Sequence, residues 1–382
     1  MISLLLLGST GSIGNNVINI VRENIDKYRI IGIAANSSLE NLIKQAKEFN
    51  IKYIGIYNKE ICERARQLYP EFHFFCGLDG ILEMVKSLDY DYLVNAIVGG
   101  VGLLPSYYAV GKAKRIALAN KESLVVGGYF LKEKLNNSDT ELIPVDSEHS
   151  AVFQSIGNHR AFLKKIVLTA SGGPFYFKKN IDFSIIKPEE ALKHPTWNMG
   201  KKITIDSATM FNKALEIIEA YHLFDLKAEQ IEVIIHPQSY IHSFVEFIDG
   251  IQIAQMSIPD MKFPIQYALS YPDRLPSSME NPPLYKLGKL EFYEPDMDRF
   301  KSIKIAYESL KSSKVAPAVL NYANEVAVDA FLQERISFDK IFAFVESSIS
   351  RYCGENINDF DNFVAYIEEL IIKLKDDLKS WG

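Results

Sequence analysis

The sequence predicts an α/β protein with three parts: an N-terminal Rossmann-like doubly wound domain, a central α+β domain with a mixed sheet, and a small C-terminal helical domain. Three observations support this prediction. A glycine-rich turn follows the first apolar run, strand and helix patterns alternate over the first third, and helical periodicity dominates after residue 298. The 382 residues also exceed the ~250–300 residues at which single hydrophobic cores stop growing.

The first element is a strand–turn–helix unit. Residues 2–7 are apolar, GSTGSIG follows, and VINIVREN has helical spacing. Gly8, Gly11 and Gly14 allow a sharp turn, and the amides at the helix start favour a pyrophosphate. The spacing is GxxGxxG rather than GxGxxG, so a plain tight turn is the alternative. Further strand patterns at 29–35, 53–57, 92–100 and 115–123 favour a dinucleotide at the carboxyl ends of a parallel sheet.

The end of the second strand bears on the choice of cofactor. An acid there would bind the ribose hydroxyls of NAD, whereas Asn36, Ser37 and Ser38 follow the strand here. This favours NADP, although the nearby Glu40 leaves NAD open.

Composition excludes some classes of function. The net charge is −6 with no long basic run, so no global field attracts nucleic acid or an anionic membrane. Cys62, Cys76 and Cys353 form no CxxC pair, and we therefore expect neither a disulfide framework nor a thiolate zinc site. The N-terminal apolar run is too short for a membrane span and lacks the basic region of a signal peptide.

An apolar run at residues 142–145 is followed by acidic residues. Asp146 and Glu148 are two apart, so in an extended chain both side chains would point to one face at the strand end. Two converging carboxylates repel each other unless a cation lies between them, and Mg²⁺ or Mn²⁺ would need further oxygen ligands. A solvated strand end is the alternative.

The stretch IDSATMFNKALEIIEAYHLF supplies a third carboxylate. Its pattern predicts one helix, capped by Asp206 or Ser207, that carries Asn212, Lys213 and Glu216 on one polar face. The alternative for Glu216 is an ordinary helix salt bridge to Lys213.

Possible anion ligands occur around the same helix. Ser171 precedes a Gly–Gly pair, Ser207 lies at the expected helix start, and Asn212 and Lys213 add an amide and a charge. Each alone could be a turn, a cap or a surface lysine.

Between these groups, the loop HPTWNMGKK carries Trp197 and Met199. Large apolar groups in such a loop fit a lid that closes over substrate, with packing on its own domain as the alternative. His194 could bind an anion or serve as a cap. His236 and His242 have no zinc-site spacing, which favours core or interface positions.

Taken in order, eight sequence blocks resemble one enzyme family. GSTGSIG, NAIVGGVGLLP, LANKESLV, PVDSEHSAVFQS, LTASGGPF, HPTWNMGKKITIDSATMFNKALEIIEA, IHPQSYIHS and LNYANEVAVDAFL span residues 8–332. They closely resemble the 1-deoxy-D-xylulose 5-phosphate reductoisomerases of the non-mevalonate isoprenoid pathway. Members convert this ketose phosphate to 2-C-methyl-D-erythritol 4-phosphate by skeletal rearrangement followed by hydride reduction.

The resemblance implies NADPH and one divalent cation, Mg or Mn with Co possible, as cofactors. It assigns the metal to Asp146, Glu148 and Glu216, with Lys213 also catalytic. It assigns the substrate to Ser147, Ser171, His194, Ser207, Asn212 and Lys213, the lid to Trp197 and Met199, and the cofactor to Thr10, Gly11, Ser12, Ile13, Asn36, Ser37, Asn120, Lys121 and Glu122. Many members have a lysine after the second strand, where Asn36 to Ser38 stand here, so the strictness for NADP over NAD is open.

The resemblance also implies an organisation and a setting. We expect an NADPH-binding domain at 1–146, a catalytic, metal-binding, substrate-binding and dimerisation domain at 147–271, a linker at 272–297 and a helical domain at 298–382. The expected protein is a cytoplasmic homodimer of bacterial type without a transit peptide, acting on a small phosphorylated sugar and binding neither nucleic acid nor membrane.

Two other functions fit the sequence less well. An aldehyde or semialdehyde dehydrogenase would need a nucleophilic cysteine in the second domain, and residues 77–352 contain none. A nucleotide-binding redox sensor without turnover would be expected to lack a metal carboxylate or Lys213, and all of them are present.

Overall fold

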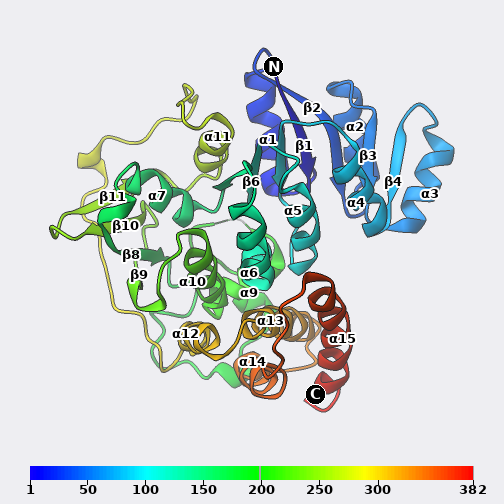
Figure 1. Cartoon of the computed structure of the whole chain (residues 1–382). Coiled ribbons are helices and arrows are strands. Elements are labelled where there is room, and N and C mark those ends of the chain that lie inside the picture. The colour runs from blue at the N-terminus through cyan, green and yellow to red at the C-terminus, as the bar shows by residue number, and fades with distance from the viewer. Residues whose placement is uncertain (198, 382) are drawn as a thin grey trace. The chain divides into compact units, whose positions relative to one another are not determined.

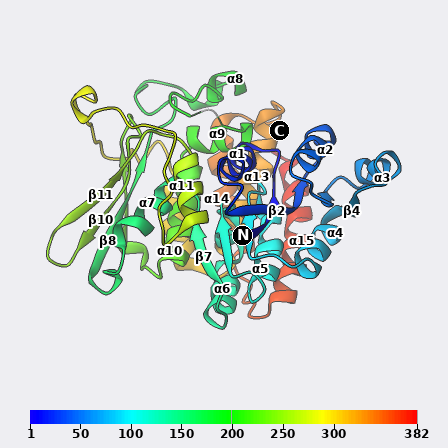
Figure 2. The same cartoon turned by 90° about the horizontal axis from the view of Figure 1, so that it is seen from above.

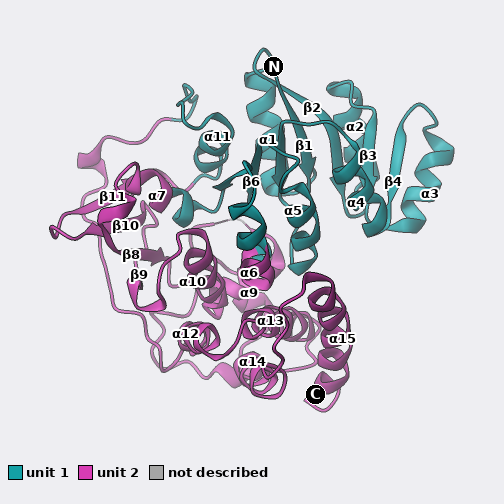
Figure 3. Cartoon of the chain, viewed as in Figure 1, with its two compact units in different colours: residues 1–123, 131–150, 260–279 teal, residues 124–130, 151–259, 280–382 magenta. Residues whose placement is uncertain are grey.

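The chain forms two compact units. The computed structural model describes residues 1–197 and 199–381. Unit 1 comprises residues 1–123, 131–150 and 260–279, and unit 2 comprises residues 124–130, 151–259 and 280–382 (Figure 3). One break between the units falls at residue 150, where the expected boundary was 146. Residues 260–271, which were expected in the central domain, belong to unit 1.

Unit 1 is built on a seven-stranded parallel sheet (Figure 1). Its strand order is β4-β3-β2-β1-β5-β6-β7, with β1 Ile2–Leu7, β2 Tyr28–Ala35, β3 Tyr53–Ile56, β4 His73–Cys76, β5 Tyr92–Asn95, β6 Arg115–Leu118 and β7 Glu141–Pro144. The predicted doubly wound fold is therefore confirmed, with β4 as a strand that the sequence patterns did not indicate. The order reverses between β1 and β5, which is where ligands bind in such sheets.

The helices of unit 1 follow the strands. They are α1 Ser12–Glu23, α2 Leu39–Glu48, α3 Lys59–Leu68, α4 Gly77–Ser87, α5 Leu103–Ala109 and α11 Lys262–Ser270, while α6 Glu122–Asn136 and α7 Ser147–Ile156 run from one unit into the other. Right-handed crossovers place α1, α2 and α3 on one face of the sheet and α4 and α5 on the other. The strands β1 and β5 at the reversal are fully buried apart from their ends, as expected for a sheet covered on both faces.

Arg115 attaches the late segment 260–279 to the sheet of unit 1. Its side chain is 4% exposed, and its guanidinium donates to Glu141 Oε2 at 2.5 Å and to the carbonyl of Ala268 at 3.2 Å. The aromatic rings of Tyr92 and Tyr271 lie against the same guanidinium. These contacts, together with the packing of α11 on α1, explain why the segment groups with the N-terminal residues.

Unit 2 contains the expected mixed sheet (Figure 2). Its order is β11-β10-β8-β9, with β8 Leu163–Ala170, β9 Ile231–Ile235, β10 Ile241–Phe247 and β11 Gln252–Met256. The pair β8 and β9 is parallel, whereas β10 is antiparallel to both β8 and β11. The strand β11 lies at an edge.

Unit 2 also contains helices. They are α8 Pro188–Ala191, α9 Lys201–Ala208, α10 Phe211–Leu223, α12 Ser302–Ser312, α13 Ala316–Leu332, α14 Phe338–Tyr352 and α15 Phe360–Leu378. The four helical patterns after residue 298 thus form α12 to α15, and Phe331, Phe338 and Phe342 pack their rings together within them. Across residues 1–197 and 199–381, no helix has both the length and the apolar character that a membrane crossing requires.

The expectation of unpaired cysteines is wrong for two of the three. Cys62 on α3 and Cys76 at the end of β4 form a disulfide, with their Cα atoms 5.5 Å apart, while Cys353 is free. The two residues are 14 positions apart, so no short motif marks them. They meet because α3 packs directly on the strand that follows it.

The extended geometry expected at residues 146–149 is also wrong. The strand β7 ends at Pro144, and Ser147 begins α7. The amide of Ser150 donates to the carbonyl of Asp146 at 2.8 Å, which makes Asp146 the residue that precedes the helix. Asp146, Ser147 and Glu148 are therefore gathered by a helix start and not by the alternation of a strand.

Candidate active site

The glycine-rich turn has the close packing that a dinucleotide site requires. Gly8 has a φ of 83° at the end of β1, and a Cβ built there would overlap the carbonyl of Ala96 after β5. A Cβ at Gly14 would overlap the carbonyl of Gly8. Only glycine fits at these two positions, and the turn leaves the exposed residues Gly11 and Ser12 at the start of α1. Helix-start amides in this position suit a pyrophosphate.

Polar side chains hold the backbone of this turn from outside it. Asn15 donates to the carbonyl of Thr10 at 3.1 Å. Gln45 on α2, which is 7% exposed, donates to the carbonyl of Ser9 at 3.1 Å. The contact from Gln45 was not predicted, since nothing in the local sequence connects residues 36 positions apart.

The turn after β2 is open to solvent. Asn36, Ser37 and Ser38 are exposed between Ala35 and the start of α2. The carbonyl of Asn36 accepts from the amide of Asn58 at 3.0 Å, which ties this turn to the start of α3. Hydroxyl and amide groups can hydrogen-bond a phosphate without charge.

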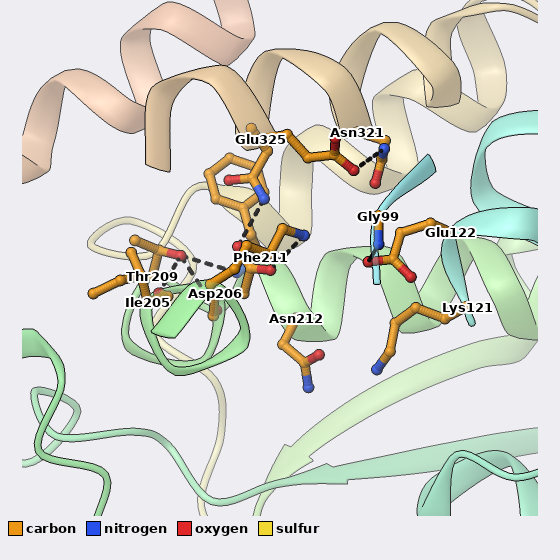
Figure 4. A network of polar contacts seen from close by, with 12 residues as sticks. Gly99, Lys121, Glu122, Ile205, Asp206, Thr209, Phe211, Asn212, Asn321 and Glu325 are labelled. Carbon is orange, nitrogen blue, oxygen red and sulfur yellow. Dashed lines mark hydrogen bonds and ion pairs between the residues drawn. The ribbon is translucent and has the colours of Figure 1, made fainter. Parts of the chain in front are cut away.

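Asn120 ties together the loops that follow β5 and β6. Its amide donates to the carbonyls of Ile97 and Gly99 at 2.8 and 2.9 Å, and its carbonyl oxygen accepts from the amide of Ser123 at 2.9 Å. Glu122 adds a further link because its Oε1 accepts from the amide of Gly99 at 3.2 Å (Figure 4). The predicted cofactor residues 120–122 therefore form a rigid, buried loop at the carboxyl edge of the sheet.

Lys121 makes a buried ion pair with Asp146. Each side chain is 9% exposed. Burial by itself would raise the pKa of Asp146, but the charge of Lys121 and the neighbouring His149 hold it well below its usual value. Asp146 is therefore a carboxylate, as metal binding requires, and Ser147 donates to Glu148 Oε2 at 2.5 Å beside it.

The second charged cluster lies on α10 in unit 2. Lys213 and Glu216 form an ion pair one turn apart, and Asn212 donates to Glu216 Oε1 at 2.5 Å. The helix salt bridge that was the alternative to metal binding by Glu216 therefore exists. It is not an ordinary surface pair, however, because Lys213 is 3% and Glu216 is 1% exposed. Burying two charges is expensive and seldom stabilises a fold. This burial favours a functional role over an ordinary surface pair.

The single helix expected from Asp206 to Tyr221 is interrupted. Asp206 and Ser207 lie in the last turn of α9, and α10 begins at Phe211 after Met210, whose φ is 58°. The prediction that Asp206 or Ser207 caps the helix carrying Glu216 is therefore wrong. At the end of α9 the Thr209 hydroxyl donates to the carbonyl of Ile205 at 2.9 Å (Figure 4), and the Thr209 carbonyl accepts from the hydroxyl of Ser302, a residue of the distant helix α12.

His194 brings the two predicted phosphate serines together. Its Nε2 lies 3.1 Å from Ser171 Oγ and 3.0 Å from Ser207 Oγ. Gly172 and Gly173 follow Ser171 with φ values of 86° and 63°, so the Gly–Gly pair forms the predicted turn. Three residues that are 23 and 13 positions apart thereby form one polar cluster.

The hydrogen bonds of Nδ1, the other ring nitrogen of His194, determine which nitrogen carries the ring proton. Nδ1 accepts from the amides of Thr196 and Trp197 at 3.1 and 2.9 Å. Burial lowers the pKa of His194 to about 4, so the ring is neutral near pH 7. Because Nδ1 accepts two hydrogen bonds, the proton is on Nε2, and the cluster presents donors to an anion. His194 therefore both fixes the start of the loop and faces the serines.

The remaining predicted side chains of this region lie in unit 2. Trp197 is half-buried with its ring 6.5 Å from that of His242, and Met199 is also half-buried. His242 Nε2 lies 3.0 Å from Ser257 Oγ. His236 is fully buried and its ring stacks on Phe292. The two histidines are buried, as the core interpretation expected.

A parallel sheet with a glycine turn at the reversal of strand order defines unit 1 as a dinucleotide-binding oxidoreductase fold. Family models agree with this class and narrow it. A model described as 1-deoxy-D-xylulose 5-phosphate reductoisomerase matches residues 4–128, and models for C-terminal domains of the same enzyme match residues 142–224 and 256–370. A relative from Thermodesulfovibrio yellowstonii, a 1-deoxy-D-xylulose 5-phosphate reductoisomerase, is 48% identical over 91% of both chains. One from Prosthecochloris aestuarii is 44% identical over 96% of both.

Solved structures give the same result. The chain matches a crystal structure of the reductoisomerase in complex with NADPH, fosmidomycin and magnesium with a TM-score of 0.94 and 38% identity, covering 100% of this chain and 98% of that one. The enzyme from Zymomonas mobilis in complex with NADPH matches with a TM-score of 0.91 and 38% identity, covering 99% of both. The chain belongs to the 1-deoxy-D-xylulose 5-phosphate reductoisomerase family.

Proposed function

We propose that this chain converts 1-deoxy-D-xylulose 5-phosphate to 2-C-methyl-D-erythritol 4-phosphate, using NADPH and a divalent cation. Relatives of this name align over nearly the whole chain. The observation that carries the proposal is the buried Lys213–Glu216 pair with Asn212 on α10. A fold has little reason to bury such a pair unless a bound group uses its charges.

Asp146 and Glu148 of unit 1 and Glu216 of unit 2 are the proposed ligands of one cation. All three offer carboxylate oxygens, which suit Mg²⁺ and Mn²⁺, with Co²⁺ as a substitute. The low pKa of Asp146 keeps that group ionised. When bound, the cation polarises adjacent carbonyl and hydroxyl oxygens of the ketose phosphate. Ser147 and Lys213 bind and orient those oxygens.

The phosphate of the substrate is the proposed ligand of the His194 cluster. Ser171 and Ser207 offer hydroxyls, Asn212 offers an amide, and His194 contributes the Nε2 proton. A neutral histidine still donates at neutral pH, so this cluster binds a phosphate without having to gain a proton. Trp197 and Met199 are the proposed lid, which excludes water from the reacting groups.

NADPH is the proposed ligand of the unit 1 turn and supplies the hydride when bound. Thr10, Gly11, Ser12 and Ile13 would hold the pyrophosphate. Asn36 and Ser37 would hold the 2′-phosphate, and Asn120, Lys121 and Glu122 would border the nicotinamide. The proposal is supported by the close packing at Gly8 and Gly14, where a side chain would overlap neighbouring backbone, and by the exposed helix start at Gly11 and Ser12. A carbon–carbon bond of the substrate breaks and re-forms to give a branched aldehyde, which is then reduced.

The test follows the loss of nicotinamide absorbance. Purified protein is mixed with 1-deoxy-D-xylulose 5-phosphate, Mn²⁺ and NADPH, with Glu216→Gln as the negative control. We expect oxidation that needs all components and is removed by a chelator. Wild-type protein that oxidises NADPH no faster than Glu216→Gln would overturn the proposal. Repeating the assay with NADH measures how strictly the Asn36–Ser38 turn selects NADP.

A homodimer through the edge strand β11 is part of the proposal. Ile253 on this strand is 42% exposed, and Ile248 and Ile251 on the preceding turn are 68% and 58% exposed. An edge strand with apolar residues can pair with a second chain. Sedimentation velocity should give twice the chain mass, and Ile253→Lys should shift the protein to monomer. A wild-type monomer at micromolar concentration would contradict this.

A cytoplasmic location is also proposed, because the reaction consumes NADPH. The Cys62–Cys76 bond argues against it, since disulfides are rare in reducing compartments. Alkylation of thiols in intact cells, followed by mass spectrometry, distinguishes a reduced cysteine pair from a disulfide. Both cysteines should be alkylated if the chain works in the cytoplasm.

A further inference from the structure

Asp206 is a buried carboxylate that no proposed step uses. It is 1% exposed within α9. Its Oδ2 lies 2.7 Å from Lys202 Nζ, one turn earlier on the same helix. Its Oδ1 accepts from Asn324 Nδ2 at 2.7 Å, although Asn324 is 118 positions later on α13. Both oxygens are thus held by donors, one of which comes from the C-terminal helices.

Asp206 immediately precedes Ser207, whose Oγ lies 3.0 Å from His194 Nε2. The backbone at Ser207 has no spare room, because a Cβ built at Gly173 would lie 2.7 Å from the Ser207 carbonyl oxygen. A displacement of Asp206 would therefore be transmitted to Ser207 and to the turn that carries Ser171.

The junction between α9 and α10, which follows Ser207, also receives a hydrogen bond from the C-terminal helices. Ser302 at the start of α12 donates to the carbonyl of Thr209 at 2.8 Å. Met210 follows with a φ of 58°, a conformation that residues other than glycine rarely adopt. Figure 4 shows Asp206 and Thr209 at this junction, beside the helix that carries Asn321 and Glu325. The C-terminal helices thus supply hydrogen bonds where α9 ends and α10 begins.

From this arrangement we infer that Asn324 is a positioning residue for the substrate phosphate, acting through Asp206 on Ser207. The inference rests on the proposed function of the His194 cluster. A buried carboxylate next to an anion site would repel the anion if its oxygens were free to turn toward it. The amide of Asn324 and the ammonium of Lys202 each hold one oxygen in place and fix the last turn of α9.

Asn321 provides a matched control. It is also an asparagine on α13, one turn before Asn324, and both residues are 0% exposed. The amide of Asn321 donates to Glu325 of its own helix at 2.9 Å, while that of Asn324 reaches α9. Replacing either residue removes one buried amide from the same helix, but only one replacement removes the link to Asp206.

The experiment compares Asn324→Leu with Asn321→Leu in the NADPH oxidation assay. We expect Asn324→Leu to raise the KM for the phosphorylated substrate about tenfold or more, because a hydrogen bond to a charged group is lost. The kcat and the dissociation constant of NADPH, followed by nicotinamide fluorescence, should stay within about threefold, as for an interaction made equally in ground and transition states. Asn321→Leu should lower the unfolding midpoint similarly and leave this KM unchanged.

A rescue variant separates positioning from packing. Asn324→Asp sets two carboxylates against each other and should raise the KM at least as much as Asn324→Leu. Adding Asp206→Asn restores a donor and an acceptor with exchanged roles and should recover most of the loss. If Asn324→Leu does not fold, Asn324→Ser gives the same comparison with a smaller change in volume.

The outcomes are distinct. Equal KM values for wild type and the Asn324 variants, equal effects at Asn321 and Asn324, or no recovery in the double variant would each overturn the inference. Wild-type protein without substrate-dependent NADPH oxidation would instead refute the proposed function from which the inference starts.

Discussion

The buried ion pairs Lys121–Asp146 in unit 1 and Lys213–Glu216 in unit 2 are assembled in different ways. In unit 1, Lys121 and Asp146 follow the neighbouring parallel strands β6 and β7 and meet because the carboxyl ends of those strands share an edge. In unit 2, Lys213 and Glu216 are one turn apart on α10. The first pair therefore depends on the sheet, and the second depends on a single helix. Similar electrostatics can thus arise from long-range or from local structure.

The largest expected effect tests whether both acids bind the cation. Asp146→Asn and Glu216→Gln should each lower kcat/KM about a thousandfold or more, because metal stabilisation of developing charge is worth several kcal/mol. Rates are measured over a titration of Mn²⁺. Glu229→Gln, a change at an exposed surface pair, should leave the rate unchanged. Near-normal activity in either acid variant would exclude that residue as a ligand.

The next effect concerns stability without metal. Lys121→Met and Lys213→Met each leave a buried carboxylate without its lysine, which should cost about 3–5 kcal/mol of unfolding free energy. Urea unfolding in the presence of a chelator measures this loss, and Mg²⁺ should recover part of it by restoring a positive charge.

Lys311→Met, at an exposed pair with Glu229, is the control and should cost less than about 1 kcal/mol. A loss at Lys121 or Lys213 no greater than this control would mean that the pairs are not needed for folding. Unequal losses at the two lysines would show that the sheet and the helix support their pairs differently.

A smaller effect is expected in the phosphate cluster, where His194 is neutral. His194→Gln removes the Nε2 donor and the Nδ1 acceptor, and it should raise the KM for substrate about 10- to 100-fold. Binding of NADPH at unit 1 should not change. Steady-state kinetics and nicotinamide fluorescence give the two values. A fall in kcat with an unchanged KM would instead indicate a role in the chemical step.

The smallest expected effect is on the pH dependence of stability, which differs between His194 in unit 2 and Asp146 in unit 1. The pKa of His194 falls from 6.5 to about 4 on folding, so below pH 6.5 the unfolded chain binds a proton that the folded chain does not. The stability of the folded state that depends on a neutral His194 is fully present above pH 6.5. It is lost as the pH falls toward 4. Asp146, with a lowered pKa, contributes above its usual value of 3.8 and loses that contribution only at lower pH.

Unfolding midpoints measured between pH 7 and 4 should therefore decline in wild type and decline less in His194→Gln. Asp146→Asn should leave the shape of this curve unchanged over the same interval. Identical curves for wild type and His194→Gln would contradict the neutral state of His194.

Local sequence patterns predicted the parts of the fold that depend on neighbouring residues. The glycine turn at Gly8 to Gly14 and the helices after residue 298 were predicted because turn chemistry and helical periodicity act over a few positions. Glu216 and Lys213 were placed on one helix face for the same reason, since they are three residues apart. The family blocks then marked residues such as Ser171 and Ser207 that no local rule could connect.

Only the tertiary structure decided which distant residues meet. The break at Met210, the Cys62–Cys76 bond and the hydrogen bond from Asn324 to Asp206 all depend on elements packed far from each other in sequence. Periodicity reports which face of an element is apolar but carries no information on which element packs against it. Sequence alone therefore determined most strands of the N-terminal sheet, the C-terminal helices, the glycine turn and the acid–lysine pair on α10. Packing decided the bend between α9 and α10 and the partners of Asp146 and Asp206, because those contacts exist only after distant elements come together.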